Sequence, residues 1–298
     1  MCVHAHPDDE ASKGAGTVAL YHSQGVRTVL VTCTGGEEGD ILNPAMESPE
    51  VRDRLAEIRR EELARSAEII GYDRVVLLGY RDSGMPGTPA NDDPRSFARA
   101  PLDEAVGRLV AVIRGERPQV VITYPQEQSR YPHPDHLRVN EISELAFDAA
   151  GDPDRYPEAG PVWQPSRLCY VHWSARRMKA LHDKFVELGL ESPFEGDRLE
   201  RILADAAADA DSHLPKVRVD VSSHASVSRN ALLAHATQVD PNSRWWFGLP
   251  PEVANTVYPF EEYEVARDLT GREPPADDLF DGVETTTAGV GTGRSGRG

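Results

Sequence analysis

The sequence has few cysteines, no long apolar run and no recognisable leader. Its three cysteines, Cys2, Cys33 and Cys169, are too few and too scattered among 298 residues to form a disulfide framework or a zinc site of thiolates. No stretch of about 18 apolar residues occurs, so no membrane span is predicted. The first residues lack the basic and apolar regions of a signal peptide. We therefore expect a soluble protein of a reducing compartment, by default the cytoplasm.

Positive charge is also scarce. The chain has 32 Lys and Arg against 49 Asp and Glu, which gives a formal net charge of −17 at pH 7. Binding to nucleic acid requires a basic surface, and an anionic membrane would repel this chain. We therefore expect neither as a partner and look for a small-molecule ligand instead. The sequence does not predict the oligomeric state.

Segments typical of buried strands alternate with segments typical of amphipathic helices. The expected strands are residues 26–34, 75–78, 120–124, 168–172 and 216–221, and the expected helices are residues 11–24, 52–70, 102–113, 137–150, 175–188 and 226–237. This alternation predicts an α/β fold, a Rossmann-like, mostly parallel sheet with helices on both faces. In such sheets ligands bind at the carboxyl ends of the strands.

The chain is expected to form a single domain over residues 1–282. Residues 241–275 are rich in proline and aromatic residues, and we interpret them as an irregular covering segment rather than a second domain. Residues 283–298 consist largely of Thr, Gly, Ser and Arg, which predicts a disordered tail. Only residues 1–5 precede His6 of the first motif described below, which is short for a buried first strand and raises the question whether Met1 is the natural start.

Two clusters of imidazoles and carboxylates follow expected strands. Residues 4–10 are His-Ala-His-Pro-Asp-Asp-Glu, and residues 131–136 are Tyr-Pro-His-Pro-Asp-His. Acidic residues at a helix start often serve only as caps, but capping does not explain the pair of motifs at equivalent sheet positions. A catalytic zinc takes three N or O ligands and keeps one position for a water whose pKa falls to about 7. A further carboxylate and histidine can transfer protons beside it.

These motifs resemble those of the N-acetylglucosaminyl de-N-acetylase-like (PIG-L) superfamily of zinc hydrolases, most closely its mycothiol S-conjugate amidase branch. The resemblance covers roughly residues 1–282. Further matching stretches are residues 12–14, 34–37, 39–46, 82–84 and 234–238. Lys13 and residues 41–46 favour the amidase branch over the sister deacetylases.

The resemblance implies roles for the motif residues. It makes His6, Asp9 and His136 the ligands of one zinc ion per chain. It makes Asp8 the general base and His133 the oxyanion stabiliser and acid, with Asp135 orienting His133 and Tyr131 polarising the scissile carbonyl.

The resemblance also implies contacts to substrate. Arg59 and Asp82 match positions that hold sugar and inositol hydroxyls, and Lys13 matches a position that recognises the cysteinyl part. For Arg59 a place on an ordinary charged helix face is an equally good interpretation. Residues 125–130 lack the two glycines usual in this loop of the family and include a proline and an arginine instead, which leaves substrate preference open.

The expected reaction is hydrolysis of the amide between an N-acylcysteine S-conjugate and glucosaminyl-inositol, which would detoxify thiol conjugates. Deacetylation of N-acetylglucosaminyl-inositol or a related sugar is the nearest alternative. A non-catalytic protein that binds sugar conjugates is the second. A metal-dependent phosphoesterase is disfavoured, because one metal site is evident and the chain is acidic. Iron could replace zinc in such a site.

Overall fold

The computed structural model describes residues 1–126, 128, 132–202, 204 and 214–284. Tyr131 and nearly all of the predicted disordered tail therefore lie outside the described residues. None of the helices in these ranges is both long enough and apolar enough to cross a membrane.

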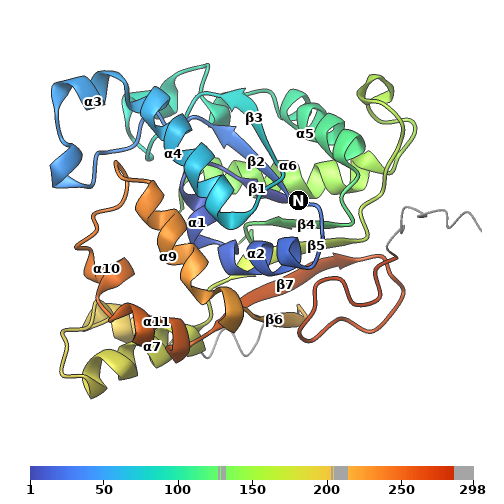
Figure 1. The fold of residues 1–298 in the computed structure, drawn as a ribbon. Helices are drawn as coiled ribbons and strands as arrows, with labels where there is room; N and C mark the ends of the chain where they lie inside the picture. Colours follow the sequence, from blue (N-terminus) through green and yellow to red (C-terminus); the bar gives the residue numbers. More distant parts are fainter. Residues whose placement is uncertain (127, 129–131, 203, 205–213, 285–298) are drawn as a thin grey trace, which may run out of the picture.

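The described residues form one seven-stranded sheet with the order β3-β2-β1-β4-β5-β7-β6 (Figure 1). Five neighbouring strands are parallel: β1 (Cys2–His4), β2 (Val29–Thr34), β3 (Arg74–Tyr80), β4 (Val120–Thr123) and β5 (Arg167–His172). The strand order reverses between β1 and β4, and ligands of open α/β sheets bind at such a switch point. The predicted Rossmann-like, mostly parallel sheet is confirmed.

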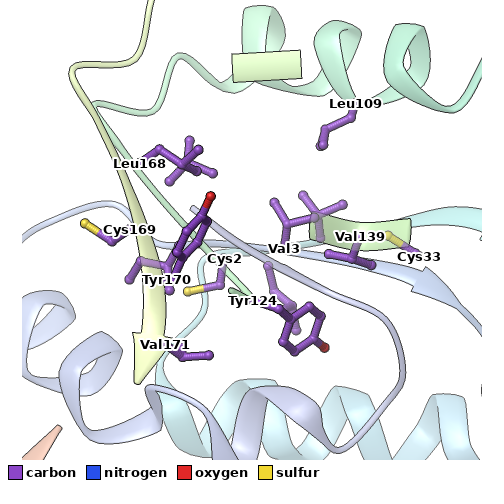
Figure 2. Packing of buried hydrophobic residues seen from close by; sticks show 14 of the residues in the cluster. Cys2, Val3, Cys33, Leu109, Tyr124, Val139, Leu168, Cys169, Tyr170 and Val171 are labelled. Atoms are coloured by element: carbon purple, nitrogen blue, oxygen red, sulfur yellow. The ribbon is translucent and has the colours of Figure 1, made fainter. Parts of the chain in front are cut away.

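Helices cover the sheet in two groups. On one face α1 (Asp9–Ser12), α2 (Ala15–Ser23) and α4 (Leu55–Ile70) pack against α9 (Ala225–Ala234), and on the other α5 (Leu102–Glu116) packs against α6 (Pro134–Ala150) (Figure 1). The predicted helices on both faces are thus present. The central strands are buried on both sides, which explains why they are nearly continuous apolar runs. Figure 2 shows Cys2 and Val3 of β1 among apolar side chains of this core.

A smaller group of elements lies next to this core. It contains α7 (Ala175–Glu187), α10 (Arg244–Phe247) and α11 (Pro251–Val257), and it has its own apolar cluster of Ala175, Met178, Phe185, Phe194, Ile202 and Leu249. The remaining short elements are α3 (Pro49–Asp53), η1 (Pro44–Met46), η2 (Pro89–Asp92), η3 (Phe97–Arg99), η4 (Pro157–Ala159) and η5 (Ser222–His224).

Two expectations about secondary structure are wrong. The predicted helix over residues 11–24 is two helices, because Gly14 adopts a φ of 101° that ends α1 and begins α2. The segment 241–275 is not irregular throughout, because it contains β7 (Phe260–Asp268), which pairs antiparallel with β5 and with β6 (Lys216–Asp220). The glutamates of β7 interrupt the apolar residues by which a strand is recognised in a sequence. One of them, Glu261, accepts hydrogen bonds from the Gly16 and Thr17 amides at the start of α2.

Candidate active site

The turn from β1 into α1 presents the first motif in an uncommon backbone conformation. Asp8, the residue before α1, has a φ of 121°, a region that non-glycine residues rarely adopt. The surroundings stabilise this turn: the Asp8 amide donates to Glu10 Oε2 at 2.9 Å, and Arg59 Nη2 donates to the Pro7 carbonyl at 2.5 Å. Strained residues of this kind are concentrated at functional sites.

The second motif begins α6. His133 is the N-cap, and its Nδ1 accepts a hydrogen bond of 3.2 Å from the Asp135 amide, while Pro134 takes the first helical position. Because Nδ1 is the acceptor, a neutral His133 ring has its hydrogen on Nε2. Burial, together with the nearby His6 and His136, lowers the pKa of His133 to about 4, so the ring is neutral at pH 7.

His6, Asp9 and His136 converge on one point. Their ligand atoms lie within 4.8 Å of one another and all three residues are buried. Asp9 Oδ2 is 3.5 Å from both His6 Nδ1 and His136 Nε2. Two imidazoles and a carboxylate are the donor set of a catalytic zinc. The residues thus fit such a metal, and they are the three that the sequence predicted as ligands.

His6 also connects this group with a second cluster, formed with Asp82, His133 and Asp135. His6 Nε2 lies 3.2 Å from Asp135 Oδ2 and 3.6 Å from Asp82 Oδ1. Burial disfavours a charged His6, but hydrogen bonds to these carboxylates outweigh it and raise the pKa of His6 well above its usual value. With Nε2 donating to Asp135, Nδ1 is left to face Asp9 Oδ2, 3.5 Å away. A carboxylate that binds one ring nitrogen in this way orients the other nitrogen of a histidine toward a metal.

Asp135 therefore has a wider role than the one predicted for it. Its Oδ2 accepts from the Ser83 amide at 2.9 Å, and its Oδ1 accepts from the Ser83 hydroxyl. Its contact with His133 is through its backbone amide, and its carboxylate contacts His6. The sequence did not assign a role to Ser83, although it lies in the matching stretch 82–84.

Asp8 lies beside the three candidate metal ligands His6, Asp9 and His136, which we call the metal group. Its carboxylate is partly accessible. Its side chain is 30% exposed, and its Oδ2 is 3.2 Å from Arg59 Nη2. Partial removal from water raises the pKa of Asp8, and the neighbouring Arg59 opposes this shift. A carboxylate in this position can accept a proton from a reactant next to the metal group.

Tyr124 at the end of β4 is a site residue that the sequence did not identify. Its hydroxyl donates to Asp9 Oδ2 at 2.6 Å and accepts from the Ala5 amide at 2.9 Å. Its ring stacks on His136, with centroids 4.5 Å apart and planes 7° apart. Tyr124 therefore holds two of the three metal-group residues. Its position directly after a buried strand was the available signal.

The buried carboxylate of Glu10 connects the first motif with α4 and with the end of α9. Glu10 Oε1 lies 2.6 Å from His235 Nε2 and accepts from the Ser66 hydroxyl at 2.5 Å, and both Glu10 and His235 are fully buried. Burial raises the pKa of Glu10, but His235 outweighs it and the pKa is lowered. Burial lowers the pKa of His235, but Glu10 outweighs it and the pKa is raised. Both shifts favour the charged forms of this pair, which contacts the Asp8 turn through the hydrogen bond from the Asp8 amide to Glu10 Oε2.

The three residues predicted to bind substrate are all found at this site. Lys13 Nζ is 2.5 Å from Asp9 Oδ1, and Asp82 belongs to the second cluster and accepts from the Gly84 amide at 2.8 Å. Arg59 is 2% exposed, and it donates to the carbonyls of Gly36 and Pro7 as well as to Asp8. Contact of these residues with substrate stays a prediction, as does the role of Tyr131.

The fold and the site together define an α/β protein with a histidine–aspartate metal group at its switch point. Residues 1–147 match the family model described as GlcNAc-PI de-N-acetylase. A mycothiol S-conjugate amidase of Streptomyces coelicolor is 42% identical over 297 residues, 95% of this chain and 96% of that protein. The chain belongs to the GlcNAc-PI de-N-acetylase family, as its motifs predicted.

A second relative is named as a deacetylase and not as an amidase. A 1D-myo-inositol 2-acetamido-2-deoxy-alpha-D-glucopyranoside deacetylase of Geodermatophilus obscurus is 40% identical over 292 residues, 95% of this chain and 97% of that protein. Among solved structures, the N,N'-diacetylchitobiose deacetylase of Pyrococcus horikoshii superposes with a TM-score of 0.59 at 18% identity, covering 92% of this chain and 85% of that one. That likeness shows the shared fold.

Proposed function

We propose that this chain is a zinc-dependent amide hydrolase that cleaves N-acylcysteine S-conjugates from glucosaminyl-inositol. The observation that supports it most is the convergence of His6, Asp9 and His136 next to a strained, accessible Asp8. The amidase of Streptomyces coelicolor, which matches this chain over nearly its full length, gives the substrate class.

His6, Asp9 and His136 would hold the metal. When bound there, zinc lowers the pKa of a water to about 7 and withdraws charge from the scissile carbonyl. The acidic character of the surrounding cluster favours a cation, because Asp9, Asp82 and Asp135 all face His6. Zinc, one ion per chain, is the metal we propose.

Two residues of the chain assist the reaction. Asp8 accepts the proton of the water that adds to the amide carbon. His133, neutral with its hydrogen on Nε2, donates a hydrogen bond to the oxygen that becomes negatively charged. The C–N bond then breaks, and the amine leaves with the proton that Asp8 accepted from the water. The products are an N-acylcysteine carboxylate and glucosaminyl-inositol.

Deacetylation is the second candidate, since the relative from Geodermatophilus obscurus has that activity in its name at 40% identity. The same residues would perform it on an acetyl group. Lys13 favours the amidase, because its ammonium lies 2.5 Å from Asp9 Oδ1 and its side chain is 22% exposed, where it can contact a cysteinyl part of the substrate. A protein that only binds conjugates is disfavoured, because binding alone does not require a base held in a strained backbone beside a metal group.

Two substitutions test the assignment. Asp8→Asn should retain about one zinc per chain and lose about 10²- to 10⁴-fold in kcat on a cysteine conjugate. His136→Ala should lose the zinc itself, measured by elemental analysis after gel filtration. Full turnover by Asp8→Asn, or full zinc content in His136→Ala, would overturn the corresponding role.

A further inference from the structure

Residues 234–238 form one of the stretches that match the family in sequence, yet the proposed reaction gives them no role. They follow α9, and Thr237 fixes them to α4, because its amide and its hydroxyl both donate to the Glu62 carboxylate, at 2.8 and 2.7 Å. The Thr237 carbonyl accepts from the Leu42 amide at 2.8 Å. These contacts hold the backbone next to His235 in place.

The His235 ring makes a single hydrogen bond. Its Nε2 lies 2.6 Å from Glu10 Oε1 and donates to it, since a carboxylate can only accept. Its Nδ1 has no hydrogen-bond partner among the described residues. Both residues are 0% exposed, so neither can contact a substrate. Any effect of His235 on the site must therefore pass through Glu10.

Glu10 in turn contacts the backbone of the proposed base. Its Oε1 also accepts from the Ser66 hydroxyl at 2.5 Å, and its Oε2 accepts from the Asp8 amide at 2.9 Å. Asp8 has a φ of 121°, and such a conformation persists only where the surroundings hold it. A continuous series of hydrogen bonds thus runs from His235 through the Glu10 carboxylate to the strained residue.

We propose that His235 is a positioning residue that, through Glu10, holds Asp8 in the backbone conformation used for catalysis. Without His235, Glu10 Oε1 would accept from the Ser66 hydroxyl alone among the described residues, and a buried carboxylate that has lost its partner is costly. The Asp8 amide would lose a fixed acceptor, and the turn could relax toward an ordinary φ. The proposal rests on the function proposed above, because it requires Asp8 to be the base.

The test compares His235→Leu, which removes the donor, with His235→Gln, whose side-chain amide can donate to Glu10 in its place. Both are assayed as zinc-loaded enzymes, on the cysteine conjugate or the acetylated sugar, whichever the wild type hydrolyses. His235→Leu should lose about 10- to 100-fold in kcat, the scale of a catalytic group displaced by about 1 Å. Its KM should change less than about twofold, because no substrate contact is removed. His235→Gln should recover most of the lost kcat.

A double-mutant cycle with Asp8→Asn tests whether His235 acts through Asp8. In the Asp8→Asn background, His235→Leu should lower kcat less than about twofold, because the group that it positions is already absent. An equal loss in both backgrounds, an unchanged kcat in His235→Leu, or a loss confined to KM would overturn the proposal. If His235→Leu does not fold, Ser66→Ala replaces it in the cycle, with a smaller loss expected in the same direction.

Asp268→Asn is the matched control. Asp268 Oδ2 is 2.8 Å from Nη2 of the fully buried Arg167, at the amino end of β5 and thus at the opposite end of the strand from the candidate site. This variant should be less stable to urea and keep the kcat of the wild type. A loss of kcat equal to that of His235→Leu would overturn the proposal, because loss of any buried pair would then suffice. Full turnover by Asp8→Asn would instead overturn the proposed function, and the role of His235 with it.

Discussion

Removal of the Tyr124 hydroxyl should weaken both the fold and the metal group. In Tyr124→Phe the Asp9 carboxylate loses a 2.6 Å donor, and the buried Ala5 amide loses its acceptor. A lost hydrogen bond to a charged group and an unpaired buried N–H together should destabilise the metal-free protein by about 2–4 kcal/mol. Because Asp9 is then held less firmly, by the His6 amide and Lys13, zinc affinity should fall about 10- to 100-fold, the usual cost of losing a partner behind a metal ligand.

Urea denaturation of the metal-free protein and zinc titration against a competing chelator measure the two effects separately. Tyr80→Phe is the control, since Tyr80 is also buried in the sheet and its hydroxyl has no hydrogen-bond partner among the described residues. The control should change zinc affinity less than about twofold. Equal zinc affinity in Tyr124→Phe and Tyr80→Phe would refute the role of Tyr124 as the residue that positions Asp9.

Two further predictions concern the Asp8 turn and the pair behind it. Asp8→Gly should be more stable to urea than Asp8→Ala by about 1–3 kcal/mol, because glycine adopts a φ of 121° without strain; equal stabilities would contradict the strained turn. Glu10→Gln should destabilise the protein by leaving His235 without its anionic partner. The stability difference from wild type should be largest between about pH 4.5 and 6.5. It should decrease at lower pH, as Glu10 with its lowered pKa is protonated, and at higher pH, as His235 with its raised pKa loses its proton. A pH-independent difference would contradict a charged pair.

The sequence predicted the parts of the fold that depend on local pattern. Apolar strands and amphipathic helices have strong periodicity, so β2, β4, α5 and α6 were found within a few residues of their true bounds. It missed β7, because a partly exposed strand of alternating Glu and apolar residues has little hydrophobic signal. It also missed the break at Gly14, where a backbone conformation rather than composition divides one predicted helix.

In the candidate site too, the sequence predicted the residues that lie in local motifs and missed those that act through long-range contacts. His6, Asp9 and His136 were predictable because they lie in two short motifs that parallel strands bring to one sheet edge. Tyr124, Ser83 and Glu10 support those residues through contacts between segments more than 50 residues apart in the sequence. No local spacing encodes such contacts. The direction of the Asp135 carboxylate toward His6 was likewise visible only in three dimensions.

The central claim is that this metal group hydrolyses the amide of a cysteine conjugate. The most direct test measures zinc content and, on the same preparation, amine release from a mycothiol S-conjugate and from N-acetylglucosaminyl-inositol. The account predicts about one zinc per chain and a kcat/KM that strongly favours the conjugate. A preference for the acetylated sugar would move the chain to the deacetylases, and turnover that survives complete removal of metal would contradict the account.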